Sequence, residues 1–282
     1  MPLALSIHRR KANAIEALFG HRKAVIGVIH SRPLPGSPAY DGEPVARIYD
    51  YALGEARRYQ AGGVDGLIVE NHGDIPFAKP GEIGPETAAA MAVMSENVRK
   101  ATGLPIGVNV LANAAIPALA VAKAAGAAFI RVNQWANAYV ANEGFMEGKA
   151  GAATRYRAWL RASDVRIFAD VHVKHGAHAI VADRSLAEMT RDAEFFDADA
   201  VIVTGQRTGH SADPEELAAI KAATSLAVLV GSGVNADNIA AIFNHADAVI
   251  IASSIKHEGA WWNEVDPARL AAFMAVVRTL RA

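Results

Sequence analysis

Eight short apolar runs, each followed by a loop and an alanine-rich amphipathic segment, restrict the fold of this chain more than any other feature of the sequence. Short runs rich in β-branched residues are typical of strands that are buried on both faces. Strands that alternate with helices form a parallel sheet, and eight such units close into a (β/α)₈ barrel. We therefore predict a TIM barrel with strands at Ala24–His30, Gly66–Glu70, Ile106–Val110, Ala128–Asn133, Arg166–Val171, Ala200–Thr204, Ala227–Val230 and Ala248–Ile251.

The whole chain, residues 1–282, is expected to form this one α/β barrel domain. Barrels of about 250 residues are commonly single domains, and no linker or low-complexity stretch divides the sequence. The hydrophobic content of 52% and the charged content of 20% fit a protein with a large buried sheet. Residues 11–20 carry apolar side chains at helical spacing, which predicts a helix that caps the bottom of the barrel.

The composition also excludes several kinds of partner and site. A net charge of −1 provides no basic field for nucleic acid or anionic lipid. The chain has no cysteine, which excludes disulfides, thiolate metal sites and cysteine nucleophiles. The apolar part of the N-terminal segment MPLALSIHRRK is too short for a secretory signal, and no run approaches the about 20 apolar residues of a membrane span. We expect a cytoplasmic protein and, as is common for such barrels, a homo-oligomer.

Two neighbouring strand ends carry turns of small residues that suit a phosphate group. One turn follows the predicted strand Ala227–Val230 and the other follows Ala248–Ile251. Glycine lets the backbone approach a ligand closely, and the N-terminus of a helix, here expected from Asn235 to Phe243, favours anions. The last two strands of many barrels hold a phosphate in this way. We therefore predict that the phosphate of a ligand binds to Gly231, Ser232, Gly233, Ser253 and Ser254.

The fifth predicted strand carries three ionisable side chains at alternate positions. Asp170, His172 and Lys174 share one face if the strand alternation continues to its end. With Glu70 at the end of the second strand, they supply the acid, base and cation that proton transfer needs. The alternative is that these groups pair with neighbours and are structural. We predict Glu70, Asp170, His172 and Lys174 as the catalytic residues.

The other strand ends carry side chains that form hydrogen bonds, and this is where barrel enzymes keep their functional groups. We expect substrate contacts from His30, Asn109, Arg131, Asn133 and Thr204. Four of the ionisable residues, His30, Glu70, Asp170 and His172, could also hold a divalent metal, because imidazoles with carboxylates suit zinc-type sites. No local motif supports a metal, so we favour acid–base or structural roles and leave the cofactor open.

The long loops and the remaining charged residues supply further candidates. The loops after the first, second and fourth strands are long enough to form elaborated walls around the barrel mouth. Arg207 and Lys256 are candidate contacts for an anion, with ordinary surface positions as the alternative. Trp261 and Trp262 are more typical of packing or of a protein interface than of ligand stacking.

The assembled segments resemble the BtpA/SgcQ family in order and spacing. The resemblance runs from about Lys23 to the last helix, and its segments are VIGVIHSRPLPGSP, DGLIVENHGDIPF, IGVNVLANAA, AGAAFIRVN, EGFMEGKA, RYR, DVHVKH, VTGQRTG, LVGSGVN and SSIKHEG. It implies a (β/α)₈ barrel of the ribulose-phosphate-binding type. One member of the family is linked to photosystem I biogenesis in cyanobacteria, and others occur among proteins of sugar uptake and metabolism.

This chain departs from the family pattern on the substrate side. Many relatives have Leu-Arg-Asn-Asp where this chain has Leu111-Ala112-Asn113-Ala114, and Ala136-Asn137 and Ala141-Asn142 replace a Thr-Gly and a Thr-Asp. We therefore expect similar phosphate binding with a different head group.

The sequence favours an enzyme that acts on a phosphorylated sugar or nucleotide-like metabolite. Isomerase, lyase and glycosidic hydrolase chemistry all fit acid–base residues at a barrel mouth, and a lysine such as Lys174 can form a Schiff base when its pKa is lowered. The alternative is a non-catalytic assembly or stability factor for a photosystem or another complex, as the family resemblance implies.

Overall fold

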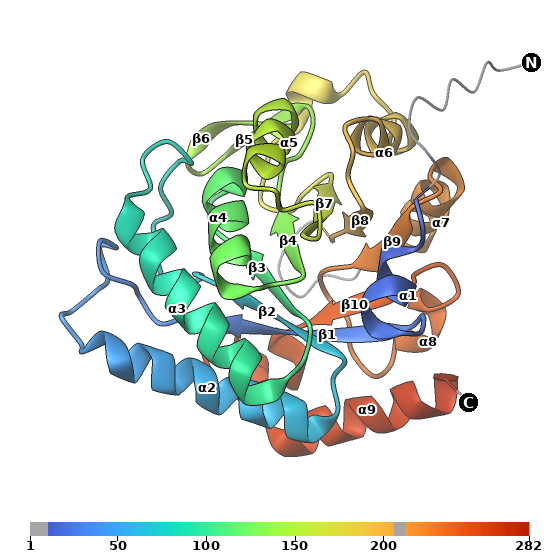
Figure 1. The fold of residues 1–282 in the computed structure, drawn as a ribbon. Helices are drawn as coiled ribbons and strands as arrows, with labels where there is room; N and C mark the ends of the chain where they lie inside the picture. The colour runs from blue at the N-terminus through green and yellow to red at the C-terminus, as the bar shows by residue number, and fades with distance from the viewer. Residues whose placement is uncertain (1–10, 206–212, 282) are drawn as a thin grey trace, which may run out of the picture.

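The strands of the protein close into a barrel, as Figure 1 shows. In the computed structural model, residues 11–205 and 213–281 are described, and within them eight parallel strands form the closed order β1-β2-β3-β4-β7-β8-β9-β10, with β10 paired to β1. The strands are β1 (Ala24–His30), β2 (Gly66–Glu70), β3 (Ile106–Asn109), β4 (Phe129–Val132), β7 (Arg166–Val171), β8 (Ala200–Val203), β9 (Ala227–Val230) and β10 (Ala248–Ile251). Each agrees with its predicted range to within one residue at either end, so the barrel prediction is confirmed.

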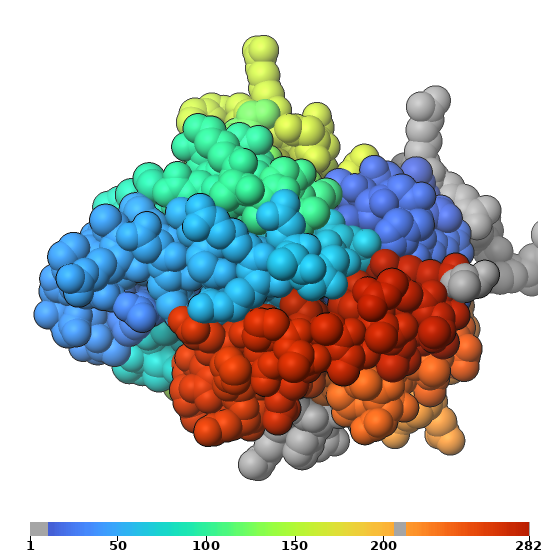
Figure 2. Space-filling view, turned by 90° about the horizontal axis from the view of Figure 1, so that it is seen from below, coloured from blue at the N-terminus to red at the C-terminus, as the bar shows by residue number. Residues whose placement is uncertain are grey.

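Helices cover the outside of the barrel. They are α2 (Val45–Gly62), α3 (Pro85–Thr102), α4 (Ala115–Ala125), α5 (Ala150–Trp159), α6 (Leu186–Phe195), α7 (Pro214–Ala223), α8 (Ile239–Ile242) and α9 (Pro267–Arg281). Helix α9 packs beside α2, so the last helix of the outer ring contacts the first helix of that ring. Figure 2 shows the surfaces of α9 and α2 in contact. None of the helices in the described ranges is long and apolar enough to cross a membrane.

The lower interior of the barrel is filled by apolar side chains. Phe129 and Phe168 stack there with ring centroids 4.4 Å apart. Gly107 makes room for them, because a Cβ at this position would lie 2.2 Å from Phe129 Cε2. Helix α1 (Ala14–Phe19) closes the bottom, where the fully buried Ile15 packs into the same cluster. The predicted capping helix is therefore confirmed.

Three aspartates at the bottom of the barrel tie neighbouring strands together. Each precedes a strand and accepts a hydrogen bond from a backbone N–H of the preceding strand. The carboxylates of Asp65, Asp199 and Asp247 accept from Val25, Ile167 and Val228 at 2.6, 2.9 and 2.9 Å. These bonds fix the register of β1 with β2, β7 with β8 and β9 with β10.

The segment after β4 forms a small hairpin where the sequence predicted only a loop. Strands β5 (Ala138–Ala141) and β6 (Gly144–Glu147) pair in antiparallel fashion, and Gly144 has a φ of 97° after the turn. Val140 of the hairpin bridges to Ala177 in the loop after β7. The hairpin therefore joins two of the loops at the mouth of the barrel.

Candidate functional site

A cavity of about 660 Å³ lies at the C-terminal ends of the strands. Because side chains alternate along a strand, the inward positions above the apolar layers fall on the last residues of the strands. These positions carry polar side chains, as the sequence predicted. Of the predicted site residues, the cavity brings together His30, Glu70, Asn109, Arg131, Asn133, Lys174, Gly231, Ser232, Gly233, Ser253 and Ser254.

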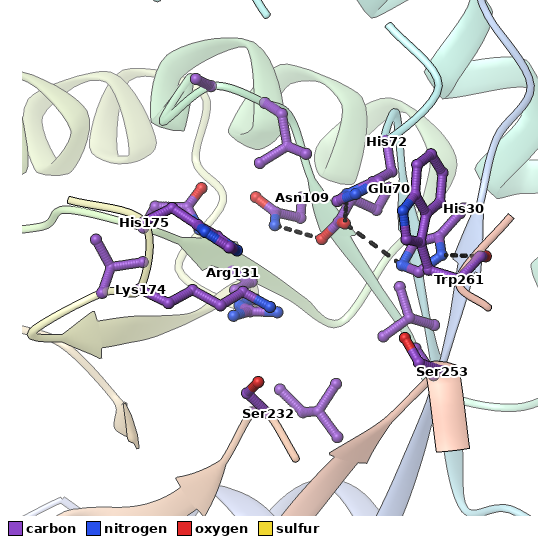
Figure 3. A pocket seen from close by; sticks show the side chains of 18 of the residues that line it. His30, Glu70, His72, Asn109, Arg131, Lys174, His175, Ser232, Ser253 and Trp261 are labelled. Atoms are coloured by element: carbon purple, nitrogen blue, oxygen red, sulfur yellow. Dashed lines mark hydrogen bonds and ion pairs between the residues drawn. The ribbon is translucent and has the colours of Figure 1, made fainter. Parts of the chain in front are cut away.

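One side of the cavity is formed by a cluster of His30, Glu70 and His72, which we call the histidine–glutamate cluster. His72 Nδ1 lies 2.9 Å and His30 Nε2 lies 3.7 Å from Glu70 Oε1. The other carboxylate oxygen accepts a hydrogen bond of 2.6 Å from Asn109 Nδ2. On its far side His30 Nδ1 is 3.0 Å from the carbonyl of Trp261, as Figure 3 shows. The carboxylate of Glu70 is therefore held by His72 and Asn109, and the imidazole of His30 is held by the carbonyl of Trp261.

Burial controls the charges in this cluster. It lowers the pKa of His30 to about 3, so this imidazole is neutral near pH 7. Burial also opposes ionisation of Glu70, but the hydrogen bond from His72 and the electrostatic influence of His72, His30 and Arg131 together outweigh it and hold the pKa of the carboxyl well below its usual range. The cluster therefore presents a carboxylate beside a neutral imidazole.

The opposite side of the cavity is cationic. Arg131 Nε and Nη2 donate to the two carboxylate oxygens of Asp170 at 3.1 and 3.0 Å, and both residues are buried. Burial opposes the charge of Arg131, but the Asp170 carboxylate outweighs it and raises the pKa of the guanidinium. Asp170 therefore positions Arg131 from below and does not itself line the cavity. A Cβ at Gly231 would lie 2.6 Å from Ile202 Cγ2, so glycine lets this turn pack against the end of β8.

Lys174 lies beside Arg131 in the cavity (Figure 3). Burial, followed by the charge of Arg131, lowers the pKa of its amine to about 8. A substantial fraction of the amine is therefore unprotonated at neutral to mildly alkaline pH, which is the state in which lysine acts as a base or nucleophile.

We expect Lys174 to react with acetic anhydride with a midpoint near pH 8, because its pKa is lowered to about 8. Competitive labelling over a pH series, read by mass spectrometry of the lysine-containing peptides, measures this midpoint. Lys100 is the control, because its side chain is 63% exposed on the surface of α3. Equal midpoints for the two lysines would show that Lys174 is not perturbed.

The third side of the cavity consists of the glycine–serine turns, residues 231–233 and 253–254. Figure 3 shows Ser232 and Ser253 facing the interior from the ends of β9 and β10. The Ser254 hydroxyl donates to the carbonyl of Val234 at 2.7 Å and so joins the two turns. Gly233 has a φ of 70°, a conformation that glycine adopts without strain.

Two expectations about this side were wrong. The helix predicted to continue from Asn235 through Phe243 is reduced to the single turn α8 (Ile239–Ile242), although Asn235 accepts hydrogen bonds from the backbone N–H groups of Asp237 and Asn238 as a capping residue does. A helix dipole therefore cannot be invoked for phosphate. Lys256 is fully buried 3.2 Å from Glu55 of α2 and points away from the cavity. Arg207 lies outside the described residues.

His172 and Thr204 do not reach the main cavity. Strand β7 ends at Val171, and His172 has a φ of 56°, so the alternation that would have placed it beside Lys174 is broken. Its ring instead lies 4.0 Å from that of His178, beside a neighbouring cavity. Thr204 lines the same neighbouring cavity, and its hydroxyl accepts a hydrogen bond of 3.1 Å from the backbone of Lys174.

Sequence reasoning missed two residues of the site. His72 follows Glu70 by two positions, and strand alternation alone would have placed it on the same face. Trp261 was assigned to packing, yet its ring centroid lies 4.3 Å from that of His72 and it lines the cavity. No local pattern marks Trp261 as a site residue, because it reaches the cavity through the irregular segment that follows β10 and not through a strand end.

A closed parallel barrel with a polar cavity at the C-terminal ends of its strands defines a TIM-barrel protein. The chain belongs to the BtpA family, whose profile matches residues 21–279. The resemblance seen in the sequence is therefore confirmed.

Relatives and solved structures agree with this assignment. An uncharacterized protein of Archaeoglobus fulgidus is 45% identical over 84% of this chain and 93% of its own length. The photosystem I biogenesis protein BtpA of Synechocystis is 40% identical over 91% of this chain and 88% of its own length. The (S)-3-O-geranylgeranylglyceryl phosphate synthase of Thermoplasma acidophilum, solved with sn-glycerol-1-phosphate, matches with a TM-score of 0.58 and 13% identity over 95% of this chain and 100% of its own. At this identity the last likeness establishes the fold alone.

Proposed function

We propose that the protein is an enzyme that acts on a phosphorylated sugar or a nucleotide-like metabolite. The observation that carries the proposal is the division of one cavity into two chemically different ends. Arg131, Lys174 and the glycine–serine turns form an end suited to a dianion, and the histidine–glutamate cluster forms an end suited to proton transfer. A ligand with a phosphate tail and a hydroxylated head matches both.

The charges of Arg131 and Lys174 and the backbone of the glycine–serine turns support phosphate binding at the first end of the cavity. Arg131 keeps its charge when buried, and a nearby dianion would favour protonation of Lys174. Small residues at Gly231, Ser232 and Ser253 allow a phosphate to approach the backbone of both turns. The geranylgeranylglyceryl phosphate synthase of the same fold carries sn-glycerol-1-phosphate in its solved complex, which supports a phosphorylated ligand in this kind of barrel.

Proton transfer is assigned to the second end. Glu70 is an ionised carboxylate held by Asn109 and His72, so it can accept a proton from a carbon or a hydroxyl of the head group. Lys174, with its lowered pKa, is the second candidate for acid–base work or for attack on a carbonyl. Asp170 acts as a positioning residue for Arg131, and His172 takes no part in this proposal.

A thermal-shift screen tests the proposal. Sugar phosphates and nucleotides are compared with the same compounds without phosphate, and a ligand at 100 times its Kd stabilises the protein by about 2.7 kcal/mol. We expect stabilisation by phosphorylated compounds alone. In Ser232→Asp we expect this stabilisation to be lost, because the new carboxylate repels the phosphate.

Ser163→Asp is the matched control, since it adds the same charge at an exposed turn before β7, at the end of the barrel opposite the cavity. Its response to ligands should equal that of the unaltered protein. Equal stabilisation by phosphorylated and dephosphorylated compounds, or no stabilisation by any of them, would contradict the phosphate assignment.

A second candidate function is a non-catalytic role in the assembly or stability of a photosystem or another complex. The Synechocystis relative bears the name photosystem I biogenesis protein, and in this chain Trp159 and Trp262 are 77% and 66% exposed. Glu70→Gln separates the two candidates in cells. If this variant retains the cellular role while Trp262→Ala loses it, the assembly function is favoured over catalysis.

A further inference from the structure

The histidine–glutamate cluster has the composition and spacing of a metal-binding site. One nitrogen of His30, one of His72 and one carboxylate oxygen of Glu70 all lie within 4.8 Å of one another. Among the described residues, no other three histidine or carboxylate side chains place their ligand atoms this close together. It differs from the set considered from the sequence, because His72 takes part while Asp170 pairs with Arg131 and His172 faces another cavity.

The donor set resembles that of catalytic zinc sites. Two imidazoles and one carboxylate bind zinc in several hydrolytic enzymes, at about 2.0–2.2 Å from each donor. Donor atoms around such an ion lie about 3–4 Å apart, as follows from those bond lengths. The separations of 2.9 Å and 3.7 Å to Glu70 Oε1 are already in this range. Small side-chain rotations would therefore suffice to bind an ion.

The outer partners of the cluster are those that orient metal ligands. A histidine that binds a metal usually donates its other ring N–H to a carbonyl or carboxylate. His30 Nδ1 lies 3.0 Å from the carbonyl of Trp261, which leaves the Nε2 lone pair directed at Glu70. Asn109 donates to the second oxygen of Glu70 at 2.6 Å and fixes the carboxylate in the same way. Figure 3 shows Asn109 and Trp261 contacting the cluster from its two sides.

Beside the cluster, a buried oxygen atom faces the cavity without a hydrogen-bond partner in the described part of the chain. Asn109 is 1% exposed, and within residues 11–205 and 213–281 its Oδ1 has no hydrogen-bond partner. A buried amide oxygen without a partner costs about 1–3 kcal/mol unless a ligand or water supplies a donor. Asn109 lines the same cavity as the cluster, so a polar group bound beside the metal would satisfy it.

We propose that His30 Nε2, His72 Nδ1 and Glu70 bind a divalent transition-metal ion of the zinc class, with its remaining positions open to the cavity. The ion would act as a Lewis acid on an oxygen of the head group, opposite the cationic end that receives the phosphate. This inference goes beyond the proposed function: with the ion bound, Glu70 is a metal ligand and proton transfer falls to Lys174, while the phosphate end is unchanged.

Titration of the metal-stripped protein with Co²⁺ tests the site. We expect one equivalent of Co²⁺ to bind and to give visible absorption stronger than that of the hydrated ion, since nitrogen ligands and low coordination replace water. Zn²⁺ should then displace it. His72→Ala should weaken Co²⁺ binding by more than about 100-fold, and Asn109→Ala, which removes an outer partner, by about 10–100-fold.

His257→Ala is the matched control, because His257 is another histidine beside a carboxylate, 3.4 Å from Asp266 on the surface. It should bind Co²⁺ as the unaltered protein does. Glu70→Gln provides a second ligand variant if His72→Ala misfolds, since glutamine can still accept from Asn109. Equal affinity in the unaltered protein and both ligand variants, or no stoichiometric binding, would overturn the metal site. The thermal-shift screen on metal-stripped protein reports separately on phosphate binding.

Discussion

Replacing Arg131 with methionine should lower the free energy of unfolding at neutral pH by about 3–5 kcal/mol. The guanidinium donates two hydrogen bonds to the Asp170 carboxylate, at 3.1 and 3.0 Å, Asn133 adds a longer one of 3.4 Å, and the side chains of Arg131 and Asp170 are buried. Methionine fills a similar volume but leaves a carboxylate without its ionic partner in a medium that solvates it poorly. Urea unfolding followed by circular dichroism measures the change.

The pH dependence of this deficit identifies its cause. Burial raises the pKa of Asp170 even with Arg131 present, and removal of Arg131 should raise it further. A carboxyl whose pKa is higher in the folded than in the unfolded protein takes up protons on folding, so the deficit should be smallest at low pH and grow toward neutral pH. Lys100→Met, which breaks an exposed pair with Glu96, should cost less than about 1 kcal/mol. A small, pH-independent loss in Arg131→Met would contradict the role given to the pair.

Replacing Lys256 with methionine should lower the free energy of unfolding by about 3 kcal/mol, the lower end of the range for a broken buried pair because Arg58 still lies 3.0 Å from Glu55, without affecting phosphate binding. Lys256 and Glu55 are fully buried 3.2 Å apart. Glu55 also accepts a hydrogen bond of 3.0 Å from the backbone of Val265, so the carboxylate holds the return of the chain after β10. Chemical unfolding gives the stability, and the thermal-shift response to phosphorylated compounds gives the binding.

The double variant with Glu55→Gln is the control for this prediction. It removes the buried carboxylate charge, which Lys256→Met leaves with only the 3.0 Å pair to Arg58, but it keeps an acceptor for Val265, and part of the lost stability should return. Loss of the phosphate response in a folded Lys256→Met protein would mean that Lys256 takes part in anion binding after all.

The barrel could be predicted from the sequence because its signal is local and repeated. Strands such as β1, β2 and β7 are apolar runs with clear ends. Because they are buried on both faces, their sequences predict strands at these positions without a competing alternative. The hairpin of β5 and β6 was missed because two four-residue strands with mixed side chains carry no clear alternation.

The site was predictable only as far as strand alternation holds. His30, Glu70, Asn109 and Arg131 lie inside the barrel as expected, because they stand in or at the end of regular strands. His172 was misplaced because a single residue with positive φ ends the alternation. Lys256 was misplaced because its partner Glu55 comes from a helix about 200 residues earlier in the chain, and no local pattern records such a contact.

The aspartates at the bottom of the barrel make the pairing of the strands independent of the loops that surround the cavity. Asp65, Asp199 and Asp247 hold pairs of strands in register from the end opposite the cavity. Insertions and substitutions in the upper loops therefore leave the strand pairing intact. A gene encoding such a frame can acquire a new head-group specificity by drift in a few loops, while the chain continues to fold and to bring the same strand ends together.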